Sequence, residues 1–291
     1  MNTLDEATLR QWPLPVADEA SDKEDRGQVL VIAGGREIPG AALLAGTAVL
    51  RAGAGKLTVA TVQSVAQGLA LALPEARVIG LAETALGGPT ASSVSQLQAC
   101  ASSAAVVLVG PGLPAGDEND RFVDLLLAGL GTTPVLLDAS AMDKLLDGRR
   151  FSQPVMVTPH AGEMAHLSGR TKREVLDDAP AAATALAHKH NATVVLKGAD
   201  TYVATPAGLL WHHCLSNPGL ATSGSGDVLA GIIAGIVARG ATLEQAAAWG
   251  VVVHALAGQR LAERCGPLGF LARELLAGIP RVLRKIARKA A

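Results

Sequence analysis

Residues 217–235 read NPGLATSGSGDVLAGIIAG, a glycine-rich turn followed at once by an apolar helical run, and this stretch is the most informative part of the sequence. Gly219, Gly224 and Gly226 allow backbone conformations that other residues resist, so the turn can direct several N–H groups at a bound phosphate. Asp227 lies where the helix is expected to begin, and apolar residues follow it at helical spacing. Because Asp is also a favoured N-cap residue, the stretch predicts either an anion-binding helix start or an ordinary capped helix.

Short apolar runs alternate with longer helical stretches along the rest of the chain, which predicts an α/β fold. The expected architecture is a central, mainly parallel sheet with helices on both faces. The predicted parallel strands are 28–32, 57–61, 105–109, 134–138, 154–158 and 193–197. Residues 201–204 and 210–213 flank a Pro/Gly turn, and we expect this hairpin to add antiparallel strands at one edge of the sheet.

Five of these runs end in glycine or in a polar cluster. GG follows residue 32, GPG follows 109, DAS follows 137, TPHAGE follows 157 and KGAD follows 196. In open α/β sheets the ligand binds beyond the carboxyl ends of the strands. We therefore expect these clusters to converge on one site together with the glycine-rich turn.

The composition describes one domain over residues 1–291 that acts on a small molecule. Hydrophobic residues make up 49% of the chain and aromatic residues 2%, so Ala, Val, Leu and Ile must form the core. The net charge of -1 argues against nucleic acid as a partner. No signal-like or membrane-spanning run is present, and the basic, apolar segment 281–291 is expected to be a solvated terminal helix. Three distant cysteines, Cys100, Cys214 and Cys265, indicate a reducing compartment, so we expect a cytoplasmic protein that binds no membrane.

Two familiar phosphate loops are absent from the sequence. GAGKL at 53–57 lacks the first glycine of a P-loop, since Leu50 stands there, and Leu57 replaces the residue that would hold magnesium. GGR at 34–36 lacks the third glycine and the acidic ribose ligand of a dinucleotide-binding turn. The helix start with GxGD at 224–227 therefore remains the strongest candidate for phosphate chemistry.

This GxGD segment resembles the anion hole and catalytic Asp of ribokinase-like kinases, and nearly the whole chain is similar to one of their relatives. The matching segments are GQVLVIAGGREIPGAALLAGTAVLRAGAGKLTVAT (27–61), GPGL (110–113), LLDASAM (136–142), VTPHAGEMAHLSG (157–169), VVLKGADTYVA (194–204) and residues 217–235. Together they look like the ADP/ATP-dependent NAD(P)H-hydrate dehydratase family. The resemblance implies a ribokinase-like fold and a lyase that repairs hydrated nicotinamide cofactors.

The implied reaction is the ADP-dependent dehydration of the S-form of hydrated NADH or NADPH (NADHX or NADPHX) to NADH or NADPH, with release of AMP and phosphate. A nucleotide, ADP or ATP, phosphorylates the ring hydroxyl, and Mg²⁺ accompanies the nucleotide. Asp227 would receive the hydroxyl proton. A position near a helix N-terminus favours the carboxylate, so we expect Asp227 to be ionised at neutral pH and to be a weak base.

The resemblance also assigns binding residues one by one, and none of them is a metal ligand. Ala41, Gly112 and His160, with Asp227, match positions that contact the hydrated cofactor. The nucleotide is assigned to Lys197, Gly198, Ala199, Asp200 and Thr201, and to the backbone N–H groups of Gly224, Ser225 and Gly226. From the residues alone, an ordinary strand-end lysine is the preferred explanation of Lys197, while Gly112 is equally a turn glycine and Ala41 equally part of a packed helix start.

The other histidines are expected to have structural or solvated positions. His254 lies in an apolar helical run and is expected in the core or at an interface. His212, His213 and Cys214 are adjacent on a predicted strand and so point to alternate faces, which argues against zinc. His188 and His190 end a polar helix and are expected to be solvated.

The chain departs from the family pattern at Ala161, Leu220 and Ser223, where the family usually has Pro, Met and Gly. Ser223 is the departure that can alter the turn, because it removes a permissive glycine. The resemblance implies a homotetramer, and an epimerase on a separate protein, since no epimerase domain fits before Gly27. Two alternatives stay open: a ribokinase-like kinase of a small alcohol or vitamin precursor, and a nucleotide-sensing module without catalysis.

Overall fold

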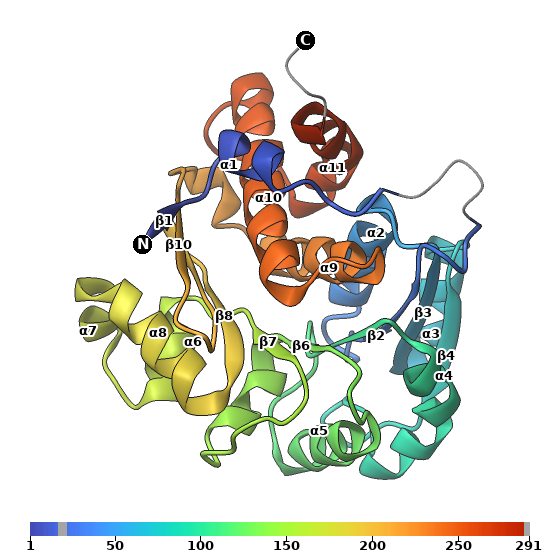
Figure 1. Cartoon of the computed structure of the whole chain (residues 1–291). Coiled ribbons are helices and arrows are strands. Elements are labelled where there is room, and N and C mark those ends of the chain that lie inside the picture. Colours follow the sequence, from blue (N-terminus) through green and yellow to red (C-terminus); the bar gives the residue numbers. More distant parts are fainter. Residues whose placement is uncertain (17–21, 288–291) are drawn as a thin grey trace.

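The computed structural model describes residues 1–16 and 22–287, and over these residues ten strands form one sheet (Figure 1). In spatial order the strands are β1 (Asn2–Thr3), β10 (Leu210–Cys214), β9 (Asp200–Ala204), β8 (Ala192–Leu196), β7 (Val155–Val157), β6 (Val135–Leu137), β5 (Val106–Val109), β2 (Gln28–Ile32), β3 (Lys56–Val62) and β4 (Arg77–Leu81). The strands from β8 to β4 are parallel, and β9 is antiparallel to both of its neighbours. The predicted α/β fold is confirmed, with the antiparallel hairpin near one edge.

All six predicted parallel strands and both hairpin strands form within a residue or two of their expected bounds. Two edge strands, β1 and β4, lie outside the predicted runs. β4 is an exposed edge strand that contains Gly80, and only its last residue is buried, so it lacks the apolar run of a central strand. β1 has two residues, which is too short to leave a periodic pattern.

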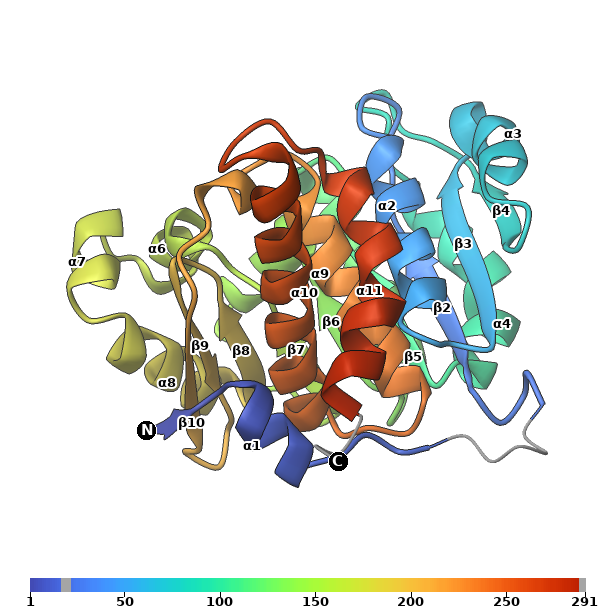
Figure 2. The ribbon, with the colours of Figure 1, turned by 90° about the horizontal axis from the view of Figure 1, so that it is seen from above.

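Alternation along the strands divides the apolar side chains between two cores. Val29 and Val31 of β2 face one core, whereas Leu30 and Ile32 face the other. Helices α2, α9, α10 and α11 cover the first face and helices α4, α5, α6 and α8 the second (Figures 1 and 2). The sheet is thus buried on both faces, as its long apolar strands require.

The helices that follow and cover the strands have these bounds: α1 (Glu6–Gln11), α2 (Gly40–Arg51), α3 (Gln63–Ala72), α4 (Gln98–Ser103), α5 (Asp117–Gly129), α6 (Ala161–Ser168), α7 (Lys172–Asp177), α8 (Ala179–His190), α9 (Ser225–Ala238), α10 (Leu243–Cys265) and α11 (Ala272–Ala287). Three 3-10 helices complete them: η1 (Ala91–Leu97), η2 (Ala139–Leu145) and η3 (Pro218–Leu220). The predicted terminal helix 281–291 corresponds to the end of α11, and its residues 288–291 lie outside the described residues. Within the described chain, no helix is both long and apolar enough to cross a membrane.

Helices α2 and α9 touch through small residues on both sides. Gly231 of α9 faces Ala45 and Ala48 of α2, and a Cβ atom added to Gly231 would lie 2.7 Å from the Ala48 Cβ. Gly235 repeats this contact one turn later, where an added Cβ would lie 2.7 Å from the Ala52 Cβ. Real Cβ atoms essentially never approach so closely. The two helices therefore pack at a distance that only glycine permits at these positions.

This contact also aligns the two helix N-termini. The contact residues on α2 advance by four when those on α9 advance by four, so both helices run in the same direction. One turn back from Ala45 and Gly231 are Ala41 and Asp227. The packing that fixes the core thereby brings the first turn of α2 to the level of Asp227.

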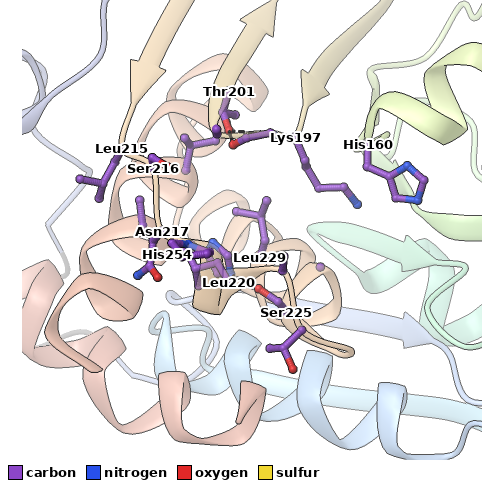
Figure 3. Close-up of a pocket in the computed structure, with 18 of the residues that line it drawn as sticks. His160, Lys197, Thr201, Leu215, Ser216, Asn217, Leu220, Ser225, Leu229 and His254 are labelled. Carbon is purple, nitrogen blue, oxygen red and sulfur yellow. Dashed lines mark hydrogen bonds between the residues drawn. The ribbon is translucent and has the colours of Figure 1, made fainter. Parts of the chain in front are cut away.

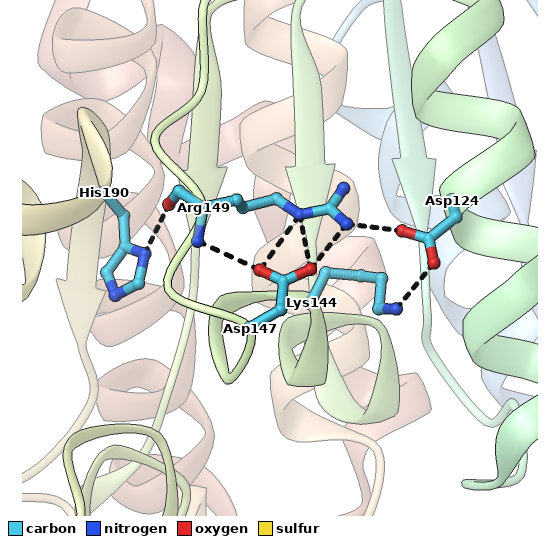
Figure 4. A network of polar contacts seen from close by, with 5 residues as sticks. All are labelled: Asp124, Lys144, Asp147, Arg149 and His190. Atoms are coloured by element: carbon cyan, nitrogen blue, oxygen red, sulfur yellow. Dashed lines mark hydrogen bonds and ion pairs between the residues drawn. The ribbon is translucent and has the colours of Figure 1, made fainter.

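The amino ends of the strands carry a network of ion pairs (Figure 4). Asp124 of α5 accepts from Lys144 at 2.9 Å and from Arg149 at 2.6 Å, and Arg149 also pairs with Asp147 at 2.6 Å. His190 is fully buried, with its Nδ1 2.8 Å from the Arg149 carbonyl oxygen. The expectation that His190 is solvated is therefore wrong, because the loop before β7 folds over the end of α8.

The helix contact gives a stability prediction in which two similar substitutions have opposite signs. Gly231→Ala should lower the free energy of unfolding by about 1–3 kcal/mol, because the new methyl group overpacks the contact with α2. Gly68→Ala, in the exposed middle of α3 with nothing within 4 Å of the new atom, should raise it by about 1 kcal/mol through helix propensity. Urea unfolding of both variants measures the pair, and a stabilised Gly231→Ala protein would contradict the close packing.

Candidate active site

The polar clusters that follow the parallel strands meet at the carboxyl ends of these strands. Strands β2, β5, β6, β7 and β8 are neighbours and parallel, so their carboxyl ends lie together. The loop after β2 is hydrogen-bonded to the loop after β5, from Gly34 N–H to the Pro111 carbonyl and from Gly35 N–H to the Gly112 carbonyl, each at 2.8 Å. An isolated β-bridge pairs His160, after β7, with Lys197, after β8. The expected convergence is observed.

Lys197 lies at the centre of a cluster of charged side chains at the carboxyl ends of the strands. Its ammonium lies 3.2 Å from Asp138 Oδ1 and 3.8 Å from Glu163 Oε2. Burial opposes the charged form of Lys197, but the two carboxylates outweigh this effect and raise its pKa. Asp138 is itself buried and accepts a hydrogen bond of 2.6 Å from the Thr158 hydroxyl. The lysine is therefore a fixed cation at the end of β8 and not a loose surface side chain.

Asp227 lies in the first turn of α9 beside this charge cluster. The N-cap of the helix is Gly224, which has a φ of 86°, and Asp227 is the third helical residue. Its side chain makes no cap hydrogen bond within the described chain, so the expectation of a capping carboxylate is wrong. Burial raises the pKa of Asp227 to about 6, with a further increase from Asp138 that Lys197 partly offsets. The expected weak base is corrected accordingly, since desolvation outweighs the helix terminus and makes the carboxylate more basic.

The backbone donors at the start of α9 differ from the predicted set. The Ser225 N–H donates to the Thr222 carbonyl at 3.2 Å, so this amide is already used within the turn. The amides of Gly224, Gly226 and Asp227 have no acceptor in the described part of the chain. Lys197 Nζ lies close to Gly226, only 3.3 Å from where a Cβ of that residue would be. Free backbone donors and an ammonium group thus lie at the start of α9, as an anion-binding site requires.

A cavity of about 690 Å³ opens beside the start of α9 (Figure 3). This volume is typical of pockets for small ligands. Of the predicted site residues, His160, Lys197, Gly198, Ala199, Thr201, Ser225 and Gly226 line the cavity. The remaining walls come from the segment 215–223 and from Leu229, Val251, His254 and Ala255. The cavity therefore runs from the charge cluster along the hairpin towards α10.

Asp200 does not take part in the cavity through its side chain. Its carboxylate accepts from His212 Nε2 at 2.7 Å, and this bond lowers the pKa of Asp200. His212 also stacks on Tyr202, whereas the neighbouring His213 is buried with its Nδ1 2.7 Å from the Leu4 carbonyl oxygen. Adjacent side chains of β10 thus point to opposite faces, as expected. Among the described residues, no group of three or more His, Cys, Asp or Glu side chains could hold a metal ion.

Ala41 and Gly112 form a second wall outside this cavity. Gly112 has a φ of 69°, and a Cβ added to it would lie 2.7 Å from the Ala41 Cβ. The two residues are therefore packed together, at the carboxyl ends of β5 and β2. Ala41 is level with Asp227 across the α2 and α9 contact, and Lys197 is near enough to Asp227 to lower its pKa.

His160 is the N-cap of α6 and also faces the cavity. Its Nδ1 accepts from the amides of Gly162 and Glu163, each at 3.0 Å, and the Glu163 carboxylate accepts from the His160 amide at 2.7 Å. This capping box fixes the ring so that Nε2 carries the proton in the neutral form. Ala161 is the first residue of α6, a position where Pro is well tolerated and not required.

The other two departures leave the glycine-rich turn intact. Ser223 is not among the non-glycine residues with positive φ, so the left-handed conformation of the turn belongs to Gly224. Leu220 packs against Gly258 of α10, where its apolar side chain replaces one of similar size.

Three residues of the site were not singled out by sequence reasoning. Asp138 follows β6 in one of the predicted strand-end clusters, which was the available signal, and Glu163 belongs to the capping motif after β7. His254 lines the cavity with its Nε2 3.0 Å from the Ser225 hydroxyl oxygen. Its place in an apolar helical run is the pattern of a core residue, so the sequence concealed its contact with the site.

Comparison with known proteins identifies the relatives of this chain. A family model described as NAD(P)H-hydrate dehydratase matches residues 29–281. The chain therefore belongs to the NAD(P)H-hydrate dehydratase family. It is 46% identical to the ADP-dependent (S)-NAD(P)H-hydrate dehydratase of Xanthomonas campestris over 99% of this chain and 98% of that protein. A second relative, a bifunctional NAD(P)H-hydrate repair enzyme of Thermofilum pendens, is 38% identical over 94% of this chain but 53% of its own length.

Comparison with solved structures assigns the chain to the same family. The ADP/ATP-dependent NAD(P)H-hydrate dehydratase of Bacillus subtilis, co-crystallized with ATP/Mg²⁺, superposes with a TM-score of 0.85 at 29% identity, over 98% of each chain. A ribokinase-like superfamily protein of Enterococcus faecalis reaches a TM-score of 0.86 at 29% identity, over 99% of this chain and 96% of that one. The fold of this chain is thus ribokinase-like, as predicted.

The charges around Asp227 give a pH prediction with opposite signs for two variants. A reaction that needs ionised Asp227 is retained above its pKa of about 6 and is lost as the pH falls through that value. Asp138→Asn removes a charge that raises this pKa, so the acidic limb of kcat should move to lower pH. Lys197→Met removes a charge that lowers it, so the limb should move to higher pH.

The measurement is the pH dependence of kcat at saturating substrates. The control is Asp147→Asn, which removes a carboxylate at the amino ends of the strands. This variant should leave the acidic limb of kcat in place. Shifts of the Asp138 and Lys197 variants in the same direction would contradict the assignment of the limb to Asp227.

Proposed function

We propose that this protein is an ADP-dependent lyase that dehydrates the S-form of hydrated NADH or NADPH. The products are NADH or NADPH, AMP and phosphate. The observation that carries the proposal is the 46% identity with a dehydratase of this name over nearly the full length of both chains. The position of Asp227 in the first turn of α9, beside Lys197 and level with Ala41, supports it independently.

The reaction begins with transfer of the terminal phosphoryl group of ADP to the ring hydroxyl of the hydrated cofactor. Asp227 accepts the hydroxyl proton as the new O–P bond forms, and its pKa of about 6 leaves it ionised at neutral pH. The phosphate then leaves with the C–O electron pair, the neighbouring ring carbon loses a proton to water, and the electron pair of that C–H bond forms the ring double bond. Phosphorylation is useful because phosphate is a far better leaving group than hydroxide.

The transferring phosphoryl group is proposed to bind between Lys197 and the start of α9. The amides of Gly224 and Gly226 donate to its oxygens, and the Lys197 ammonium balances its charge. The Ser225 amide, predicted for this role, is instead bonded to Thr222. Gly198, Ala199 and Thr201 line the cavity that receives the rest of the nucleotide, and Asp200 contributes only its backbone.

Mg²⁺ is proposed to enter with the nucleotide and to bind its phosphate oxygens, which is the usual mode for this ion. The donor set agrees with this mode, since Asp138 is already held by Thr158 and Lys197, and Glu163 by the His160 amide. When bound, the ion would neutralise charge on the phosphates. ATP is retained as an alternative nucleotide, and the preference between NADHX and NADPHX is left to the assay.

We also propose a cytoplasmic homotetramer that works together with an epimerase of the hydrated cofactor. The location is supported by Cys100, Cys214 and Cys265, which are all free thiols. The metabolic partnership is supported by the bifunctional repair enzymes, of which the chain spans about half the length. The second candidate activity, a kinase of a small alcohol or vitamin precursor, is favoured only by the shared phosphate site.

An assay with both nucleotides and both substrates tests the proposed function. Purified protein with Mg²⁺ and ADP should restore the reduced-nicotinamide absorbance from NADHX or NADPHX, with AMP and phosphate formed in equal amounts. Accumulation of a stable phosphorylated product would favour the kinase. Failure to recover the absorbance with either ADP or ATP would exclude the dehydratase.

Substitution of Asp227 separates catalysis from binding. Asp227→Asn keeps the size of the side chain but removes the base, so turnover should fall by about 10²–10⁴-fold. Binding of ADP, measured by titration calorimetry, should persist. Loss of turnover with binding retained distinguishes an enzyme from a binding module, which has no turnover to lose. Unchanged turnover in this variant would refute the role of Asp227.

A further inference from the structure

The amide of Ser225 is already used in a hydrogen bond, which leaves the hydroxyl group of this residue for a ligand. Ser225 is the first residue of α9 and lines the cavity, while its N–H is bonded to the Thr222 carbonyl. Its side chain is therefore the donor that this residue can offer to a ligand. A hydroxyl carries one proton and two lone pairs, so the neighbour it bonds decides which of these faces the cavity.

That neighbour is His254, which comes from the middle of α10. His254 Nε2 lies 3.0 Å from Ser225 Oγ, and the ring lines the cavity among the apolar side chains of Leu229, Val251 and Ala255 (Figure 3). The proposed phosphoryl transfer does not use His254. A polar ring in an apolar wall, aimed at the first side chain of the phosphate-binding helix, calls for an explanation other than packing.

We propose that His254 is a positioning residue whose Nε2–H donates to Ser225 Oγ and so turns the Ser225 hydroxyl proton towards a phosphoryl oxygen of the bound nucleotide. The inference rests on the proposed function, because it assumes that a nucleotide occupies the cavity. It adds a side-chain donor to the site at the position where the Ser225 amide is not available.

The direction of the hydrogen bond follows from the charge of the ligand. If Ser225 donated to His254, the hydroxyl would present only lone pairs to an anion, and the contact would be repulsive. If His254 donates, the hydroxyl proton remains for the phosphate. A doubly protonated ring is not required, because burial lowers the pKa of His254 to about 4. A hydrogen bond to the Ser225 backbone opposes this shift, and Lys197 makes a smaller contribution to the lowering. The neutral ring protonated on Nε2 satisfies both partners.

Binding of ADP with Mg²⁺, measured by calorimetry, tests the pair without any need for turnover. Ser225→Ala and His254→Leu should each weaken ADP binding about tenfold or more, because a hydrogen bond to a charged group is worth about 1.5–3 kcal/mol. The double variant should bind no more weakly than either single one, since both remove the same contact. His254→Gln, which keeps an N–H donor, should restore most of the affinity. Additive losses, or unchanged binding in His254→Leu, would overturn the proposal.

Three further measurements separate positioning from a general effect on the fold. His190→Leu removes another buried histidine, which lies at the amino ends of the strands, and should not change ADP affinity. The KM for the hydrated cofactor should stay unchanged in His254→Leu while the KM for ADP rises. Nitrogen chemical shifts of labelled His254 in the protein with ADP should report a proton on Nε2, and a proton on Nδ1 alone would overturn the proposal.

The same experiments distinguish this inference from the proposed function. A wild-type protein that binds ADP without dehydrating the cofactor would refute the function, while the binding cycle would still test the pair. A wild-type protein that does not bind ADP would overturn both.

Discussion

The close contact between α2 and α9 is the constraint on which the active site depends. Gly231 and Gly235 let α9 lie directly on the backbone of α2, and no larger residue fits at either position without moving one helix. Ala41 and the base Asp227 are far apart in the sequence, and this contact alone sets them at the same level. Helix packing, which elsewhere stabilises a core, here also sets the level of Asp227, the proposed base, relative to Ala41, which is proposed to contact the hydrated cofactor.

The glycine-rich stretch and the strand periodicity made much of this structure predictable. Apolar runs such as 28–32 are long enough to identify buried parallel strands, and the topology of parallel sheets then requires their polar ends to converge. Asp227 was identified because its neighbours Gly224 and Gly226 mark a phosphate-binding turn. These features depend on residues close together in the sequence, where local conformation and periodicity are sufficient evidence.

The features that escaped prediction depend on residues far apart in the sequence. The raised pKa of Asp227 comes from burial and from Asp138, which only the folded sheet brings near. The Ser225 amide is lost to a turn bond, and His254 reaches Ser225 from another helix. His190 reads as solvated because the loop that covers it cannot be recognised from its own helix. In each case a tertiary neighbour gives the residue an environment that its own sequence segment does not indicate.

The network of Asp124, Lys144, Arg149 and Asp147 contrasts with the carboxyl edge of the sheet. At the amino ends these opposite charges neutralise one another within the protein, so that edge is complete without a ligand. At the carboxyl ends the donors of α9 have no partner in the described chain until an anion arrives. The two ends of the strands thus differ in character: the charges of this network pair within the protein, whereas the free amides of α9 are left for a ligand.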